Sequence, residues 1–283
     1  MTMTNGVSDA FWAYARERYR IFSRRQRNWT PPWTKDPILQ SVYFTNIRRE
    51  DDKVTIWFKE NIRDLWRDND AQSLFNCVLF RLFTLPSTAE VLMGKGCDGR
   101  VDLFRNWDAD EAKFRMGWCS PLTTGAYMIR GIDGMTKAQS ISHIADKVWH
   151  DRHKLVTKIK KANSLQTATN LLQEYPAIGG FMAYEMVTDM RWTHLLMGAR
   201  DIMTWANAGP DCKRGLIEVF GSDAEPVQKM RTLLAESQNH QALWLPGFPV
   251  LEMRDIEHTL CEFSKYAGAK RGERQKRKYP ATK

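Results

Sequence analysis

The feature that most constrains this chain is the three-to-four-residue spacing of its apolar side chains. Residues 8–27 and 51–67 both carry such a stripe, which has the period of an amphipathic α-helix. The chain shows no regular repeat and no alternation of strands with helices, so we predict a mainly α fold. Further helices are predicted over residues 72–83, 136–149, 151–173, 180–190, 193–206, 213–220, 225–237 and 256–266.

The segments between these helices mark no clear domain boundary. Residues 28–37 contain three prolines, residues 94–109 are rich in Gly and Asp, and residues 240–250 contain two prolines and a glycine. We therefore predict a single helical domain over residues 8–266, followed by a basic, flexible tail over residues 267–283.

Composition excludes several classes of protein. The 11 Trp, 13 Phe and 8 Tyr exclude intrinsic disorder for most of the chain. No apolar run reaches the roughly 18 residues of a membrane span, and the N-terminus lacks the apolar core of a secretory signal. Five cysteines lie far apart without a C-x-x-C pair, which disfavours a zinc ribbon and fits a reducing cytoplasm.

The charge distribution favours a polyanionic partner. The formal net charge is +9, and residues 265–283 hold eight basic residues against one acid. Residues 16–27 add six arginines against one glutamate. Such clusters contact phosphates and release counterions, which favours nucleic acid over an anionic membrane surface. A solvated tail without a specific contact is the alternative.

Two familiar motifs lack their structural context. Gly94, Gly96 and Gly99 form G-x-G-x-x-G, but they follow an apparent helix where a dinucleotide site follows a strand. His150 and His153 have a metal-ligand spacing, yet no second ligand pair accompanies them, and we predict no metal site. The sequence contains no Walker A motif, so it does not read as a P-loop kinase.

Residues 171–191, LLQEYPAIGGFMAYEMVTDMR, have a pattern of two helices joined by a tight turn, which can bind a phosphate. An apolar helix ends at Tyr175, a tight turn follows, and a second helix begins at Phe181, within a unit of about residues 165–192. This pattern resembles the helix-hairpin-helix of DNA glycosylases, although Ala177 stands where glycine is usual. Gly179 and Gly180 would let the backbone approach a DNA phosphate, and a monovalent cation is a candidate ligand there. An ordinary corner between two helices is the alternative.

Seven segments taken in order resemble a known family. They are PPWTKDPIL (31–39), NIRREDDKVTIWF (46–58), LFRLF (79–83), TGAYMIRG (124–131), IGGFMAYEMVTDMRW (178–192), AGPDCKRGL (208–216) and HTLCEFSKY (258–266). The set is similar to the phage thymidine-hypermodification family. Its members are named α-glutamyl/putrescinyl thymidine pyrophosphorylases, amino acid–DNA transferases, or the helical domain associated with 5-hydroxymethyluracil DNA kinase. Asp211 and Cys212 depart from the pattern, which has a second glycine and a small residue there.

The resemblance implies a helix-hairpin-helix glycosylase-like fold and a place in phage DNA modification, in the host cytoplasm. The implied substrate is duplex DNA whose 5-hydroxymethyluracil has been phosphorylated or pyrophosphorylated by a separate kinase. The enzyme would replace that leaving group with the amine of a free amino acid, for example glycine, without a required cofactor. The alternatives are a glycosylase acting on a modified base and a non-catalytic DNA-binding partner of the kinase.

Such a transfer needs a base to deprotonate the amine and a pocket for the flipped nucleotide. Asp189, on the second helix of the hairpin unit, is the first candidate for the base, and Asp201 is its competitor. The alternative for Asp189 is a buried structural carboxylate paired with Arg191 or Arg49.

A dense charged cluster offers a second set of catalytic candidates. Glu50 and Asp51 are carboxylates that could act as the base, beside Arg48 and Arg49 as ligands of the leaving phosphate or of the amino-acid carboxylate. Asp51 and Asp52 also fit the N-terminus of a helix, where acids favour the dipole.

The remaining candidates would bind substrate or DNA. Trp33, with a core position as its alternative, would stack on the flipped base. Cys261 would be either a thiolate that adds to uracil C6 or a small core residue. Other expected substrate contacts are Thr34, Asp36, Thr124 (otherwise a helix cap), Tyr127, Glu262 and Lys265. Expected DNA contacts are Lys213, Arg214, Arg271, Arg274 and Arg277.

Overall fold

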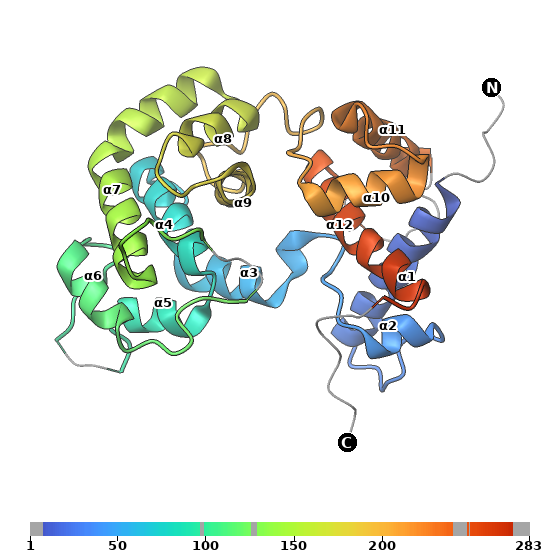
Figure 1. Cartoon of the computed structure of the whole chain (residues 1–283), viewed down its shortest axis with the longest axis horizontal. Helices are drawn as coiled ribbons and strands as arrows, with labels where there is room; N and C mark the ends of the chain where they lie inside the picture. The colour runs from blue at the N-terminus through green and yellow to red at the C-terminus, as the bar shows by residue number, and fades with distance from the viewer. Residues whose placement is uncertain (1–7, 97–98, 126–128, 240–247, 249, 274–283) are drawn as a thin grey trace. The chain divides into compact units, whose positions relative to one another are not determined.

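The computed structural model describes residues 8–96, 99–125, 129–239, 248 and 250–273, and these are helical with connecting loops (Figure 1). No β-strand occurs within these ranges, so the predicted mainly α class is confirmed. The chain divides into two compact units. Unit 1 contains Met1–Asp52 and Ile202–Lys283, and unit 2 contains Lys53–Asp201. A single domain over residues 8–266 stays a prediction, because two contact units can be parts of one domain.

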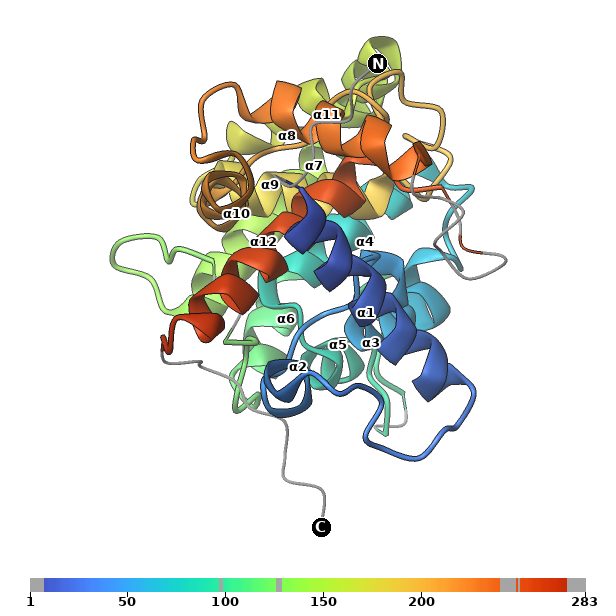
Figure 2. The ribbon, with the colours of Figure 1, turned by 90° about the vertical axis from the view of Figure 1, so that its right-hand side faces the viewer.

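Unit 1 is built from both ends of the chain. Its helices are α1 (Asp9–Gln26), α2 (Pro37–Ser41), α10 (Pro210–Phe220), α11 (Pro226–Asn239) and α12 (Met253–Lys270), with a 3₁₀ turn over Arg49–Asp51. Helices α1 and α12 are in contact, and Figure 2 shows them crossing at an angle. Phe11 of α1 meets Phe263 of α12 edge to face, with ring centroids 5.6 Å apart. The apolar stripe predicted for the first helix is therefore the surface that holds α12.

The crossing of α10 and α12 depends on a glycine. A Cβ built on Gly215 would lie 2.3 Å from the carbonyl oxygen of Leu260. Real Cβ atoms do not approach backbone oxygen so closely, so only glycine lets the two helices come together here. This crossing fixes the position of α12, which carries much of the polar cluster described below.

Unit 2 is organised around one buried helix. Its elements are α3 (Lys53–Phe58), a π-turn over Lys59–Arg63, α4 (Asp70–Phe83), α5 (Pro86–Leu92), α6 (Ala109–Met116), α7 (Lys137–Ala162), α8 (Leu165–Gln173) and α9 (Gly180–Met190). Every residue of α4 from Gln72 to Phe83 is buried, as its strongly apolar composition predicts. Helix α4 packs against α7 and α9. Thr136 and Gln139 form a capping box that starts α7.

Three sequence-predicted helices differ from the structure. Residues 193–206 form turns instead of a helix, because their backbone donors bond to other segments: His194 N–H to Arg67 O and Arg200 N–H to Asn163 O. The predicted helix 151–173 is broken at Asn163, whose φ of 44° ends α7. The last helix is longer than predicted and extends to Lys270, so the first residues of the predicted tail are helical. Gly272, with a φ of 82°, follows the end of α12.

Candidate functional site

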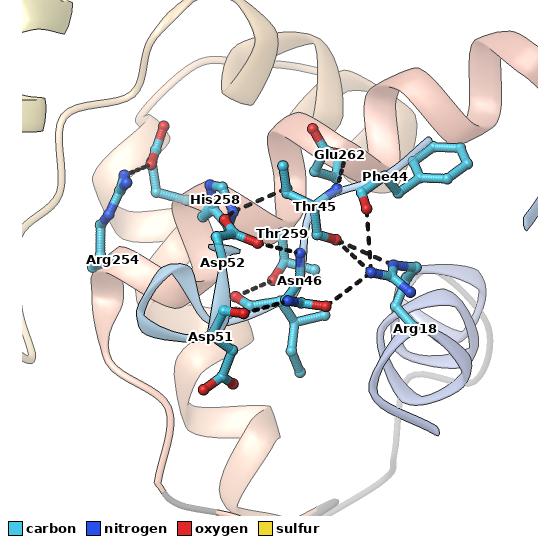
Figure 3. Close-up of polar contacts among 12 residues, drawn as sticks. Arg18, Phe44, Thr45, Asn46, Asp51, Asp52, Arg254, His258, Thr259 and Glu262 are labelled. Atoms are coloured by element: carbon cyan, nitrogen blue, oxygen red, sulfur yellow. Dashed lines mark hydrogen bonds and ion pairs between the residues drawn. The ribbon is translucent and has the colours of Figure 1, made fainter. Parts of the chain in front are cut away.

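The main polar cluster of unit 1 surrounds the loop that joins α2 to the 3₁₀ turn (Figure 3). Arg18 of α1 anchors this loop from one side. Its guanidinium donates to the carbonyl oxygens of Phe44 (3.2 Å) and Thr45 (3.0 Å) and to Oδ1 of Asn46 (3.0 Å). Arg18 is itself buried, so the charge serves to hold this backbone in one conformation.

Helix α12 supplies the other side of the cluster. Arg254, His258, Glu262 and Tyr266 are four residues apart and therefore share one face of the helix. Glu262 Oε2 accepts from the backbone N–H of Thr45 at 2.9 Å. His258 Nε2 lies 3.0 Å from Thr45 Oγ1, in hydrogen-bonding contact. These contacts tie a loop near the N-terminus to a helix more than 200 positions later in the chain.

Asp52 completes a carboxylate–imidazole–hydroxyl group. Its Oδ1 accepts from the backbone N–H of Asn46 at 2.8 Å, and its Oδ2 lies 3.5 Å from His258 Nε2. The side chains of His258 and Asp52 are 8% and 18% exposed, so the pair lies at the edge of the core. Thr45 Oγ1 and Asp52 Oδ2 both face the same ring nitrogen, Nε2, so the group is not a relay through the two nitrogens of the ring. The imidazole is nevertheless a side chain of the type that serves as a general base.

Sequence reasoning missed His258 and Arg18 and read Asp52 only as a helix-end acid. A usable signal was present in the four-residue spacing on α12, since Glu262 was already a candidate and His258 lies one helical turn before it. Asp52 does lie at a helix end, since it is the C-cap of the 3₁₀ turn and directly precedes α3, and its carboxylate also contacts Asn46 and His258.

The predicted charged cluster lies next to this group. Asp51 is partly buried and pairs with Arg48, with Oδ1 and Nη1 3.5 Å apart. Arg49 is buried, and Glu50 is partly buried in the same 3₁₀ turn. The four residues therefore adjoin the Asp52–His258 pair, and their catalytic and binding roles stay predictions.

Cys261 and Lys265 are placed by other residues of α12. Cys261 Sγ lies 3.4 Å from Glu257 Oε1, and burial together with the charge of Glu257 raises the pKa of the Cys261 thiol well above its usual range. A thiol that stays protonated is a poor nucleophile, which favours the core alternative. Lys265 contacts Glu262 at 3.2 Å and lies over the Phe44 ring.

The proline-rich loop is ordered by its own polar groups. Asp36 caps α2 by accepting from the backbone N–H groups of Ile38 and Leu39, and Tyr266 also donates to it. Thr34 is buried and its Oγ1 accepts from the Asp36 N–H. Trp33 is half-buried, its indole N–H donates to Trp29 O at 2.7 Å, and Arg25 lies over its ring. The loop is therefore a rigid wall beside α12, as a substrate-binding role requires.

The predicted DNA contacts of unit 1 lie on exposed surface. Lys213 and Arg214 are exposed on the first turns of α10, where Arg214 pairs with Asp211. Arg271 pairs with Glu218 (2.7 Å) and Glu273 (2.9 Å). Arg274 and Arg277, like Tyr127 among the predicted substrate contacts, lie outside the described residues.

In unit 2, Asp189 is a buried ion-pair partner. It is 1% exposed, and both of its carboxylate oxygens accept from the guanidinium of Arg81, with Nη2 to Oδ1 at 2.7 Å. Arg81 is on α4, 108 positions earlier, and was not among the predicted partners. Asp201, the competing candidate, caps α8 by accepting from the backbone N–H groups of Leu165 and Gln166.

The hairpin has the local geometry that its sequence predicts. Helices α8 and α9 lie side by side and are joined by residues 174–179, with Gly179 as the N-cap of α9 (Figure 1). Ala177 has a φ of 58°, the left-handed conformation that explains the usual glycine at this place. Gly180 opens α9, so the helix N-terminus follows the turn directly. Thr124, elsewhere in unit 2, donates its backbone N–H to Phe83 O.

The described part of the chain contains no group of three or more His, Cys, Asp or Glu side chains arranged to hold a metal ion. None of its helices is long and apolar enough to cross a membrane.

Comparison with known proteins assigns this helical chain to a family. The family model described as "5-hmdU DNA kinase, helical domain" matches residues 5–276, and the chain belongs to this family. A 5-hmdU DNA kinase of Bacillus phage SP10 is 25% identical over 287 residues, which cover 91% of this chain and 44% of the relative. The chain thus spans less than half of that relative's length. No solved structure matches. The family read from the seven segments is confirmed.

Proposed function

We propose that the protein is an amino acid–DNA transferase that acts on phosphorylated 5-hydroxymethyl-deoxyuridine in duplex DNA. The observation that carries the proposal is the match to the helical domain of a 5-hmdU DNA kinase by a sequence without a Walker A motif. A helical region of this family that lacks a P-loop is better suited to bind or convert the kinase's substrate or product than to transfer a phosphoryl group from ATP. The glycosylase-like fold belongs to the same proposal, and the α8–α9 hairpin supports it.

The transfer consists of one bond formed and one broken. The amine nitrogen attacks the methylene carbon on C5 of uracil, the bond from that carbon to the phosphate oxygen breaks, and (pyro)phosphate leaves with both electrons. The attacking nitrogen loses a proton to a base. Stabilisation of the departing anion requires a cation or N–H donors.

The Asp52–His258 pair is better suited than Asp189 to act as the base that deprotonates the amine. His258 is held by Thr45 and Asp52 and lies at the edge of the core. Asp189 can accept a proton only after Arg81 moves away from it, because Arg81 donates to both of its oxygens. Glu50 and Asp51 stay base candidates beside this pair, with Arg48, Arg49 and Lys265 as ligands of the phosphate or of the amino-acid carboxylate.

The partners in this proposal are duplex DNA, a free amino acid and a DNA kinase that acts first, in the cytoplasm of a phage-infected cell. No cofactor is required, and a monovalent cation at the hairpin would help to bind a phosphate.

Nucleoside mass spectrometry tests the proposal directly. The protein is incubated with kinase-phosphorylated 5-hydroxymethyluracil DNA and a pool of amino acids, and the DNA is digested to nucleosides. We expect a nucleoside carrying one amino-acid mass. Free base or abasic sites would assign a glycosylase instead, and unchanged DNA would assign a non-catalytic DNA-binding partner of the kinase.

A further inference from the structure

A pocket of about 220 Å³ lies in unit 2 beside the hairpin. One wall is a face of α7, and the other is the start of the hairpin connection, Glu174 to Pro176. Neither the sequence motifs nor the proposed site uses this pocket. Its lining from α7 consists of Lys147, Asp151, Lys154, Leu155 and Lys158.

Helical spacing gathers three lysines on this wall. Positions 147, 151, 154 and 158 follow one another at intervals of three and four residues, so three lysines and Asp151 share one side of α7. Leu155 in the lining is buried, while the three lysines are exposed. Residues 147–161 of α7 contain six Lys or Arg and one Asp. The basic face therefore carries an excess of positive charge, even with Asp151 and Glu174 in the pocket lining.

The pocket lysines are available to a ligand. Within the described residues, none of the three forms an ion pair, whereas the neighbouring Lys160 contacts Asp70 at 2.5 Å. Asp151 accepts from the phenol of Tyr175 at 2.8 Å, which fixes the hairpin connection against α7. The wall opposite the lysines is thereby held in place.

The length of the basic face indicates the kind of anion. Lys147 and Lys158 are eleven residues apart, which is roughly 16 Å along a helix. One phosphate or pyrophosphate contacts only part of this span, whereas a DNA strand carries a phosphate about every 3.4 Å along its axis. The same connection continues through Ala177 to Gly179, where α9 begins.

We propose that the α7 pocket binds backbone phosphates of the DNA strand that also contacts the hairpin. The ligand chemistry is that of a phosphate monoanion or diester, recognised by Lys147, Lys154 and Lys158. The proposal rests on the proposed function only in taking DNA as the substrate. It adds a binding surface outside every predicted DNA contact.

Fluorescence anisotropy with an unmodified DNA duplex tests this proposal. The double variant Lys154→Gln/Lys158→Gln removes two pocket lysines. The control Lys113→Gln/Lys160→Gln removes two charges of unit 2 from lysines that pair with Asp110 and Asp70. We expect the pocket variant to bind about tenfold more weakly at 0.1 M salt, with the slope of log K against log salt smaller by about 2. Thermal melts of both variants verify that they are folded.

Equal weakening in both double variants, or no weakening in either, would overturn the proposal. Equilibrium dialysis with radiolabelled pyrophosphate distinguishes a site for DNA phosphates from a site for a free phosphate compound. If the pocket variant loses pyrophosphate binding but keeps DNA affinity, the ligand is a free phosphate compound and the DNA assignment is overturned. Wild-type protein that binds DNA through the pocket but forms no adduct would refute the transferase and leave the pocket supported.

Discussion

The two units each hold a buried or partly buried acid, and the two acids are held in opposite ways. In unit 2, Asp189 faces a single arginine inside the core, and Arg81 also lies over the ring of Phe80. In unit 1, Asp52 shares its contacts between a backbone N–H and His258, at the edge of the core. The first acid is held by a guanidinium, and the second is held by a backbone N–H and an imidazole.

This difference favours a structural role for Asp189 and a chemical role for the Asp52–His258 pair. A buried carboxylate–guanidinium pair is costly to break because the remaining charge has no water, so such a pair fixes the packing of α4 on α9. The acid of unit 1 is held without an arginine partner, by a backbone N–H and an imidazole. This contrast supports the proposal that the base of the transfer belongs to unit 1.

Breaking the buried pair has the largest expected effect. We expect Arg81→Ala to lower the free energy of unfolding by about 3–5 kcal/mol, because Asp189 is left charged in the core. Urea denaturation measures this loss. The double variant Arg81→Met/Asp189→Leu is the control, and it should recover most of the stability. A single variant as stable as the wild type would show that the pair does not hold unit 2 together.

Removing the imidazole tests the other half of the comparison. We expect His258→Gln to reduce the rate of adduct formation by about 10²–10⁴-fold with DNA affinity retained, as loss of a general base does. The matched control is His194→Gln, which removes a histidine that pairs with Asp68 on the surface of unit 2. If Asp189→Asn abolished turnover in a folded protein while His258→Gln did not, the assignment of the two acids would be reversed.

Substitution of Gly215 tests how strongly the site depends on the packing of α10 against α12. Gly215→Ala places a methyl group against the Leu260 carbonyl, so α10 and α12 must separate. We expect a loss of about 1–3 kcal/mol in urea denaturation, as in overpacked cores. Gly198→Ala is the control, since an added Cβ there meets nothing within 4 Å. Equal stability of the two variants would mean that the helices adjust freely.

We expect substitution of Cys261 to have the smallest effect of the four changes. Because burial and Glu257 raise the pKa of its thiol, we expect Cys261→Ala to leave the rate of adduct formation within about twofold of wild type. Iodoacetamide labelling of this residue, followed by peptide mass spectrometry, should be slow at pH 8 and faster only at higher pH. Rapid labelling at pH 8 together with an inactive alanine variant would restore the thiolate mechanism.

Local patterns predicted much of this fold. The strongly apolar segment 72–83 predicted both the helix and its burial. Residues 193–206 have similar spacing but fold as turns, because Arg67 and Asn163 accept hydrogen bonds from their backbone. A periodicity argument cannot detect partners that lie elsewhere in the chain.

The candidate site was predictable where its residues follow one helix face. Glu262, Lys265 and Cys261 were named from the segment HTLCEFSKY, and His258, on the same face of α12 as Glu262, begins that segment. The pairing of Arg81 with Asp189 was not predictable, since 108 positions separate them and either side chain has closer charged neighbours. Which arginine meets which acid is decided by helix packing.

The discontinuous path of unit 1 sets an order of events during synthesis. Thr45 and its partner Glu262 are 217 positions apart. At about 5–20 residues per second, the ribosome needs roughly 10–40 seconds to make the intervening chain. Unit 2 is contiguous and can fold in that interval, while the loop around Thr45 waits for α12. The Asp52–His258 pair therefore assembles last, after the hairpin and the α7 pocket already exist.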